Sequence, residues 1–358
     1  MARTERLRVG ILFGGRSAEH EVSLVSAQGV MAALDRQRFQ ALPMGITRQG
    51  TWLTPRATER ALAAIKGERF RSLEEPLGEG ILHRLQALAA LRRVHVVFPL
   101  VHGSSGEDGT LQGFLELAGV PYVGAGVAAS AIGMDKALQQ AVFRQLGLPV
   151  PQSLVILASQ WANSPTAIQR QIEAEIGYPC FVKPANSGSS IGTSKLRSRQ
   201  GLDDALAEAF RYDRKALAEV SIEGRQVEVA ILGNDEPDAS PVGEVTFARE
   251  FYDYAAKYDD PNTRLHIPAD IPPGTAESIR QLALAAYKAI DCAGFARVDF
   301  FLTADQRVYI NEINTIPGFT PMSMYPKLWE AAGLPYRDLI TRLIELALQR
   351  QEEGRRGL

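Results

Sequence analysis

Two pairs of polar side chains near the end of the chain have the types and spacing that could do chemistry. Arg297 and Asp299 stand two residues apart in one apolar run, and Glu312 and Asn314 stand two apart in the next. Because side chains alternate along a strand, each pair occupies one face. Two carboxylates and an amide oxygen are hard ligands that suit Mg²⁺, which takes further ligands from water and phosphates. The sequence therefore predicts a magnesium site; the alternative is a solvated strand face with ordinary salt bridges.

A hairpin between these two runs would bring the pairs together. A four-residue loop at 304–307, one of the common lengths, places Thr303 opposite Val308. Counting back from that pair puts Asp299 opposite Glu312, with Cβ atoms about 4.5–5.5 Å apart. The remaining two polar side chains face each other in the same register.

A second chemical signal is a lysine followed by a loop of small polar residues. Lys183 ends an apolar run, and residues 184–192 are rich in Gly and Ser, including Ser189 and Ser190. Small residues with many backbone N–H donors are suited to a mobile lid over phosphates. The loop does not match the pattern G-x-x-x-x-G-K-[ST], which occurs nowhere in the chain. A flexible surface loop is the alternative.

Other chemistries are disfavoured by the residues present. Gly124-Ala-Gly126 resembles a dinucleotide fingerprint, but no acidic residue follows at the expected distance. The five histidines form no pair at i, i+4, and no G-x-S-x-G elbow appears, so hydrolase chemistry is not expected. Cys180 and Cys292 lie in apolar surroundings, which predicts buried free thiols in a reducing compartment.

Composition sets the broad class. A chain of 358 residues, 46% hydrophobic and 22% charged, predicts two or three globular domains. Thirty-nine Lys and Arg against 41 Asp and Glu give a net charge of −2, so nucleic acid is not an expected partner. No apolar run reaches about 18 residues and no signal peptide is recognisable, so we expect a cytoplasmic protein without membrane insertion.

The elements that must position these residues follow an α/β pattern. Strands and helices alternate over roughly residues 1–130, which predicts a doubly wound parallel sheet. The expected strands here are 9–13, 39–46, 94–101 and 120–123, and the expected helices are 18–34 and 111–118. Residues 51–93, with helical periodicity at 57–65 and 81–91, are interpreted as a peripheral insertion.

Two further units are expected to follow, both α+β. The predicted helices are 136–146, 168–176, 202–210, 276–290 and 337–349, and the predicted strands are 180–183, 215–220, 226–232, 243–247, 296–302 and 308–314. We therefore expect domains at 1–133, 134–222 and 223–358.

Five motifs in order resemble the D-alanine–D-alanine ligase family. They lie at 14–23, 102–113, 183–192, 251–258 and 296–323, so the resemblance covers nearly the whole chain apart from 51–93. It implies an ATP-grasp fold, in which the two α+β domains clasp ATP. It also implies two Mg²⁺ ions, replaceable by Mn²⁺, on Asp299, Glu312 and Asn314.

The resemblance implies a role for each matching residue. Lys136 and Lys183 would hold the ATP phosphates. Glu219 and the backbone near Ile222, at the hinge between the two ATP-clasping domains, would receive adenine. The full set of implied ATP contacts is Lys136, Lys183, Ser190, Glu219, Val220, Ile222, Gln226, Lys257, Asn311 and Glu312.

The substrate residues come from all three expected domains. The implied contacts to two D-alanines are Glu19, His102, Lys257, Arg297, Gly318, Ser323 and Met324. The implied catalytic group is Glu19, Ser189, Tyr258, Arg297 and Gly318. The expected reaction is ATP-dependent formation of D-alanyl-D-alanine through an acyl phosphate, for peptidoglycan precursors, and a homodimer is expected.

One position departs from the family pattern, and three other functions stay open. Gln226 stands where family members usually carry the Glu that grips the ribose, and an amide lacks the charge-assisted strength of a carboxylate. A D-alanine–D-lactate ligase would differ at Tyr258. Another ATP-grasp dipeptide ligase would lack Glu19 and its neighbours. A non-enzymatic nucleotide-binding module would be expected to have lost a metal ligand, whereas all three are present.

Overall fold

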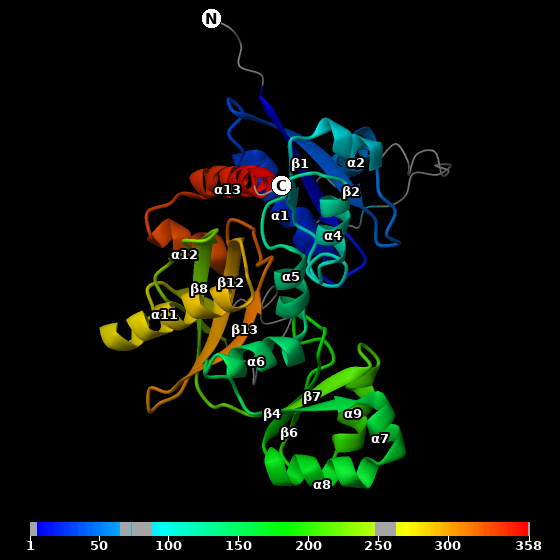
Figure 1. The fold of residues 1–358 in the computed structure, drawn as a ribbon, viewed down its shortest axis with the longest axis vertical. Coiled ribbons are helices and arrows are strands. Elements are labelled where there is room, and N and C mark those ends of the chain that lie inside the picture. The colour runs from blue at the N-terminus through cyan, green and yellow to red at the C-terminus, as the bar shows by residue number, and fades with distance from the viewer. Residues whose placement is uncertain (1–5, 65–72, 74–87, 248–262, 357–358) are drawn as a thin grey trace, which may run out of the picture.

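The computed structural model describes residues 6–64, 73, 88–247 and 263–356, which form three sheets. Figure 1 shows a parallel sheet at one end of the molecule and a four-stranded antiparallel sheet at the other. A six-stranded sheet lies between them along the long axis. The two antiparallel sheets therefore face the space in which the predicted site residues meet.

The first sheet is parallel, in the order β2-β1-β3, and both of its faces are covered. Ile11 packs with α1, whereas Leu12 packs on the opposite face with Leu111 of α4. This arrangement confirms the doubly wound unit. Its elements are β1 (Leu7–Gly14), α1 (His20–Ala33), β2 (Phe39–Ile46), α2 (Pro55–Ala64), η1 (Ala90–Arg93), β3 (Val96–Pro99), α4 (Thr110–Leu117) and α5 (Val127–Met134).

Two expectations for this region need correction. The strand predicted at 120–123 is a single parallel bridge between Val97 and Tyr122, because Pro121 has no N–H to extend the ladder. The segment 51–93 is not peripheral where it is described: Leu53, Ala57 and Leu73 are buried in the main core. The helix expected at 81–91 lies mostly outside the described residues.

The four-stranded sheet has the order β4-β7-β5-β6 and helices on one face. Alternation along β5 sends Cys180 and Val182 into the core beneath those helices and leaves Phe181 and Lys183 on the open face. Its elements are α6 (Lys136–Gln145), β4 (Ser153–Leu157), α7 (Ala158–Asn163), α8 (Pro165–Glu175), β5 (Cys180–Pro184), β6 (Ser194–Leu196), α9 (Leu202–Phe210) and β7 (Lys215–Val220).

The third sheet has the order β11-β10-β8-β12-β13, with β9 paired to β8. Val227, Val298 and Phe300 pack against the α11 side, so the intervening side chains of β8 and β12 face the cavities. Its elements are β8 (Arg225–Gly233), β9 (Asp238–Ala239), β10 (Gly243–Thr246), β11 (Arg264–His266), α11 (Pro273–Ala289), β12 (Gly294–Leu302), β13 (Val308–Asn314), α12 (Met324–Ala331) and α13 (Tyr336–Arg356).

The β12–β13 hairpin has the predicted pairing at its polar end but not at its loop. Asp299 pairs with Glu312 as expected, whereas Val308 pairs with Leu302 and not with Thr303. The loop is therefore one residue longer than predicted. A register shift at the bulged residue Asn311 restores the polar pairing.

The last helix returns to the first sheet. Leu339, Ile340 and Leu343 of α13 share a core with Val9 and Ile11 of β1, and Figure 1 shows α13 beside α1. Each sheet lies within one of the three predicted sequence ranges, but this helix crosses back. The boundaries 1–133, 134–222 and 223–358 stay a prediction.

Candidate functional site

Two adjoining cavities lie where the three sheets approach one another. The first, of about 380 Å³, is lined by the four-stranded sheet and the β8–β12–β13 face. The second, of about 320 Å³, is lined by residues from all three sheets' regions. Ser189 and Glu228 line both cavities. Groups bound in the two cavities could therefore lie next to each other.

One wall of the first cavity carries a buried ion pair. Nζ of Lys183 lies 2.6 Å from Oε1 of Glu219, and Gln140 Nε2 donates to the other carboxylate oxygen at 2.5 Å. Lys183 and Glu219 reach this wall because their neighbours along β5 and β7, Val182 and Ala218, fill the core. A cation and a hydrogen-bonding carboxylate so placed can bind phosphate and an amine-bearing ring, respectively.

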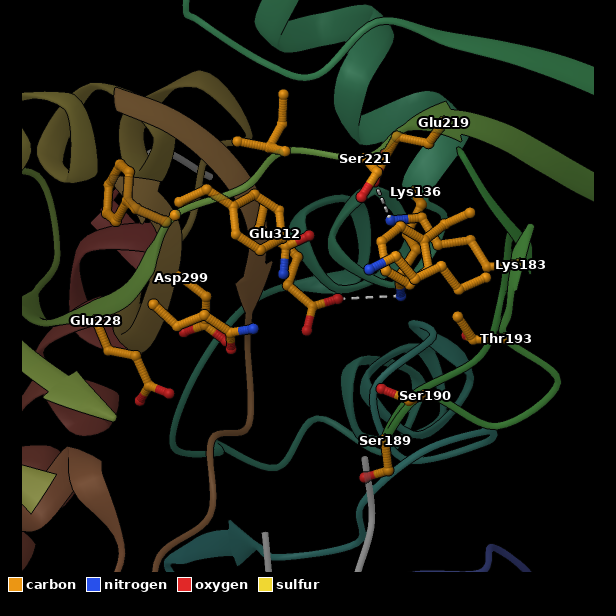
Figure 2. A pocket seen from close by; sticks show the side chains of 18 of the residues that line it. Lys136, Lys183, Ser189, Ser190, Thr193, Glu219, Ser221, Glu228, Asp299 and Glu312 are labelled. Atoms are coloured by element: carbon orange, nitrogen blue, oxygen red, sulfur yellow. Dashed lines mark hydrogen bonds and ion pairs between the residues drawn. The ribbon is translucent and has the colours of Figure 1, made fainter. Parts of the chain in front are cut away.

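Lys136 connects the two walls. It is the first residue of α6, whose N-terminus is capped by the Asp135 carboxylate accepting from the N–H groups of Ala137 and Leu138. Its Nζ donates to the Ser187 carbonyl oxygen at 2.7 Å and lies 3.1 Å from Glu312 Oε2. In Figure 2 Lys136 and Lys183 lie on one side of the cavity, and Glu312 projects between them and Asp299.

Three carboxylates form a row across three neighbouring strands. Glu228 on β8 pairs in register with Asp299 on β12, and Asp299 pairs with Glu312 on β13. All three line the first cavity. Cross-strand neighbours on one face are close enough to interact directly, so this edge of the sheet concentrates negative charge.

The guanidinium of Arg297 and the side-chain amide of Asn314 contact these carboxylates. Arg297 makes two 2.7 Å contacts to Asp299, from Nε to Oδ1 and from Nη2 to Oδ2. Its Nε also lies 2.8 Å from Oε2 of Glu228, and Asn314 Nδ2 donates to Asp299 Oδ2 at 3.0 Å. The predicted metal ligands are thus brought together, with a guanidinium beside them.

The donor set fits a hard divalent cation that shares its shell with a ligand. Asp299 and Glu312 present carboxylate oxygens to a cavity whose other wall carries lysines, and carboxylate oxygens are the ligands Mg²⁺ prefers. Within the described ranges, no three His, Cys, Asp or Glu side chains converge as a ready-made metal cage. An ion here would need an amide oxygen, water and phosphate oxygens, which is the usual Mg²⁺ arrangement.

The second cavity is joined to the Gly/Ser loop by a carboxylate. The Ser189 hydroxyl donates to Oε1 of Glu19 at 2.6 Å. Ser189 and Ser190 have positive φ angles of 50° and 58°, an uncommon and costly conformation for residues other than Gly. The loop is therefore held by specific contacts rather than by local preference.

His102 adds a titratable imidazole to the lining of the same cavity. It is buried, its Nδ1 lies 3.1 Å from the Ile316 carbonyl oxygen, and its Nε2 has no hydrogen-bond partner among the described residues. Burial acts to lower the pKa of His102, but the nearby carboxylate of Glu107, whose Oε1 lies 4.0 Å from Nδ1, and the charge of Glu19 raise it above its ordinary value. Burial raises the pKa of Glu107 as well. The raised pKa favours the protonated imidazole, which could bind an anion.

The structure brings together nearly all of the residues predicted from sequence. Those lining the first cavity are Lys136, Lys183, Ser190, Glu219, Ile222, Gln226, Asp299, Asn311 and Glu312. Those lining the second are Glu19, His102, Arg297, Asn314, Gly318, Ser323 and Met324. Val220 lines neither cavity, and Lys257 and Tyr258 lie outside the described residues.

Several residues at or beside the cavities escaped the sequence reasoning. Glu228 pairs with Arg297, Gln140 holds Glu219, and Lys195 lies in the first cavity with Nζ 5.7 Å from the centre of the Phe181 ring. Alternation along 226–232 could have shown that Glu228 shares a face with Gln226. Nothing local indicates which buried group Gln140 contacts.

Two other sequence expectations concern the cysteines and membranes. Cys180 and Cys292 are free and buried, as predicted, and burial raises their pKa values to about 11 and about 12. Neither thiol is therefore activated for chemistry. In the part of the chain that the structure describes, no helix combines the length and apolar character needed to cross a membrane.

Comparisons with known proteins match the chain at both ends. A family model described as "D-ala D-ala ligase N-terminus" matches residues 8–125, and one described as "D-ala D-ala ligase C-terminus" matches residues 142–345. The D-alanine--D-alanine ligase of Geobacillus thermodenitrificans is 47% identical over 353 residues, 97% of each chain. That of Deinococcus radiodurans is 49% identical over 345 residues, 96% of this chain and 98% of the relative.

Solved structures agree in fold. The D-alanine-D-alanine ligase from Coxiella burnetii superposes with a TM-score of 0.80 at 34% identity, covering 99% of this chain and 97% of that one. The VanG D-Ala:D-Ser ligase from Enterococcus faecalis gives the same TM-score and identity, covering 96% and 100%. The expected ATP-grasp α/β fold is thereby confirmed, and the chain belongs to the D-alanine–D-alanine ligase family.

Proposed function

We propose that this protein joins two D-alanine molecules, with ATP as the energy source, for the synthesis of peptidoglycan precursors. The observation that carries the proposal is the pair of adjoining cavities. One has lysines facing a row of carboxylates, and the other combines Glu19 with Arg297. The relatives named above, at 47% and 49% identity, are D-alanine--D-alanine ligases, which supports the same activity here.

ATP would occupy the first cavity. Lys136 and Lys183 lie where cationic groups could hold its phosphates, and Glu219, fixed by Gln140, could accept from the adenine amine. The backbone at Val220 and Ile222 would complete the adenine contact. Ser190, Asn311 and Gln226 of β8 would line the parts of the cavity that hold the phosphates and the ribose.

Two Mg²⁺ ions would be held by Asp299, Glu312 and Asn314, with Glu312 shared, and Mn²⁺ could replace them. When bound, such ions neutralise phosphate charge and orient the transferred group. The protein's own part is to supply the carboxylates at a fixed cross-strand spacing and to hold them balanced by Arg297 and Lys136 beforehand.

The first D-alanine would lie in the second cavity. Glu19 is placed to receive its ammonium group, and Arg297, His102 and the Gly318 N–H to face its carboxylate. A carboxylate is a poor electrophile, so its oxygen first attacks the γ-phosphorus of ATP, and ADP leaves. Positioning and charge neutralisation supply most of the acceleration in such phosphoryl transfers.

The second D-alanine would be held by Ser323, Met324 and Lys257. Its neutral amine attacks the carbonyl carbon of the acyl phosphate, and the phosphate leaves with the former carboxylate oxygen. Arg297 and the Gly318 N–H would stabilise the oxyanion. Ser189 and Tyr258, with Glu19, would close the site against water, which would otherwise hydrolyse the acyl phosphate.

The identity of the acceptor is the main competing question. The VanG D-Ala:D-Ser ligase matches this fold as well as the Coxiella burnetii enzyme does, so fold similarity does not choose the acceptor. A D-alanine–D-lactate ligase or another dipeptide ligase would use the same phosphate and metal residues. We also propose a cytoplasmic homodimer, which light scattering after gel filtration would test.

Phosphate release is the experiment that tests the proposal. The purified protein with ATP and Mg²⁺ should release phosphate when D-alanine is added, and much less with L-alanine. Adding D-serine or D-lactate to D-alanine, with product analysis, assigns the acceptor. Phosphate release that does not require D-alanine, or mixed products dominated by D-lactate or D-serine, would contradict it.

A further inference from the structure

Glu228 is a buried carboxylate that neither cavity's proposed chemistry uses. It lies on β8, 4% exposed, and lines both cavities at the point where they meet. Its Oε2 lies 2.8 Å from Nε of Arg297 on the neighbouring strand. A buried carboxylate is costly unless a cation or several donors engage it. The contact with Arg297 offsets part of that cost, but the presence of Glu228 at this position still needs a reason.

The guanidinium of Arg297 is shared between two carboxylates. Asp299 takes it in a bidentate arrangement, with Nε to Oδ1 and Nη2 to Oδ2 both at 2.7 Å. Glu228 contacts the same Nε from the β8 side. The three side chains are 12%, 13% and 5% exposed for Arg297, Asp299 and Glu228, so little water is present to replace any of these contacts.

These two carboxylates differ in what they do when ligands bind. Asp299 stands opposite Glu312 and belongs to the proposed metal ligands, whereas Glu228 pairs on its other side with Gly243 of β10. A metal ion bound to Asp299 would place a second cation beside the guanidinium, and the two cations would compete for the charge of one carboxylate. Metal binding must therefore weaken the contact between Asp299 and Arg297.

We propose that Glu228 is a positioning residue that keeps Arg297 directed into the second cavity when Asp299 turns to the metal. The inference rests on the proposed roles of Asp299 and Arg297 and adds a residue to them. Glu228 gives the guanidinium a second buried anion, so that Asp299 can release it without leaving a buried charge uncompensated.

The charges around Arg297 show why the carboxylate of Glu228 is needed. Three carboxylates, Glu228, Asp299 and Glu312, face two cations, Arg297 and Lys136, which leaves one net negative charge among these groups. Without the charge of Glu228, Arg297 would lose one of the two buried carboxylates that contact its Nε. A metal ion would then compete with Arg297 for Asp299 without the compensating charge of Glu228, and Arg297 would be less well fixed for substrate.

The substitution Glu228→Gln tests this, since it keeps the volume and removes the charge. ADP affinity is measured by calorimetry with and without Mn²⁺, and the gain on adding Mn²⁺ reports metal binding without turnover. We expect that gain to fall about tenfold in the variant, in the range of couplings between contacting groups. ADP affinity without Mn²⁺ should change less than about twofold, and the KM for D-alanine should rise.

A double-mutant cycle with Arg297→Gln separates positioning from a simple charge effect. If Glu228 acts through Arg297, then adding Glu228→Gln to the Arg297→Gln variant should hardly change the increase in ADP affinity that Mn²⁺ causes. An equal loss in both backgrounds would overturn the inference, because it would show that Glu228 attracts the cation directly. The thermal unfolding temperature of each variant, and partial recovery in Glu228→Asp, exclude a general loss of structure.

The outcomes also distinguish this inference from the proposed function. If Mn²⁺ fails to strengthen ADP binding to the unmodified protein, the proposed metal site is wrong and the inference falls with it. If Mn²⁺ strengthens binding equally in the unmodified protein and in Glu228→Gln, only the role of Glu228 is wrong.

Discussion

The hydroxyl of Ser189 donates to Oε1 of Glu19 at 2.6 Å, although the two residues are 170 positions apart in the chain. Ser189 belongs to the Gly/Ser loop that follows β5 of the four-stranded sheet, and Glu19 immediately precedes α1, which packs on the first sheet. This one bond ties the loop that borders the first cavity to the carboxylate of the second. Under the proposed function, this bond would couple the position of the loop over ATP to the carboxylate that receives D-alanine.

Replacing Ser189 with Ala should therefore affect D-alanine more than ATP. The variant loses a hydrogen bond to a carboxylate, about 1.5–3 kcal/mol, so kcat/KM for D-alanine should fall about 10- to 100-fold. The KM for ATP should change much less. Steady-state kinetics with each substrate varied in turn makes the measurement.

Ser187→Ala is the matched control for that variant. Among the residues that the structure describes, the Ser187 hydroxyl bonds only within its own loop, to the carbonyl oxygens of Gly188 and Ile191. This control reports any general loosening of the loop. Equal losses in the two variants would mean that the bond to Glu19 has no special part in the reaction.

Glu312→Gln should abolish ligation while leaving the fold intact. The substitution keeps the volume but removes the charge that faces both Asp299 and Lys136. We expect less than about 1% of the activity at saturating Mg²⁺, a loss in the range seen when a transition-state stabilising group is removed. Asp305→Asn, which changes an exposed carboxylate in the loop of the same hairpin, should keep normal activity. Near-normal turnover in Glu312→Gln would show that the hairpin does not hold the metal.

Gln226→Glu should strengthen ATP binding. Gln226 lines the first cavity on β8, and a carboxylate there would make a charge-assisted bond to the ribose. The KM for ATP should fall about three- to tenfold with little change in kcat, as for an interaction made equally in ground and transition states. Glu228 is already engaged by Arg297, so it does not replace this contact. An unchanged KM would place the ribose elsewhere.

The His102–Glu107 pair should make stability fall as pH rises. The pKa of each group lies above its ordinary value, 6.5 for His102 and 4.5 for Glu107. The folded protein therefore holds these protons more tightly than the unfolded chain does. The stability that this contributes is complete below the unfolded pKa values and is lost as pH rises through the folded ones.

Unfolding temperatures between pH 5 and pH 9 test this sign. The unfolding temperature should fall with rising pH more steeply in the unmodified protein than in Glu107→Gln, because the carboxylate that holds the imidazolium is then absent. All other groups titrate in both proteins, so the difference between the two curves isolates the pair. Identical pH dependence, or a steeper fall in the variant, would contradict the assignment.

The sequence was most informative where local patterns act over short distances. The pairing of Asp299 with Glu312 follows from alternation along two adjacent strands, and it is present in the structure. The loop length was wrong by one residue, and the bulge at Asn311 compensated for it. A bulge inserts one extra residue into a strand, and alternation alone does not reveal where that residue lies.

Contacts between distant segments could not be derived in the same way. Glu228 lies beside Asp299 because β8 pairs with β12, and a strand's neighbours are set by the whole topology. The burial of Leu73 is similar, since the weak periodicity of 51–93 gave no indication of a core residue. The proximity of Glu19 to Ser189 was implied only by resemblance to the family.

The most direct test of the account follows oxygen from substrate to product. D-Alanine labelled with ¹⁸O in its carboxylate is incubated with ATP, Mg²⁺ and the protein, and the released phosphate is analysed by mass spectrometry. Because the activated carboxylate loses one oxygen with the phosphate, each phosphate formed with D-alanyl-D-alanine should carry one ¹⁸O atom. Dipeptide formed together with unlabelled phosphate would show that ATP does not activate the D-alanine carboxylate, and would contradict the account.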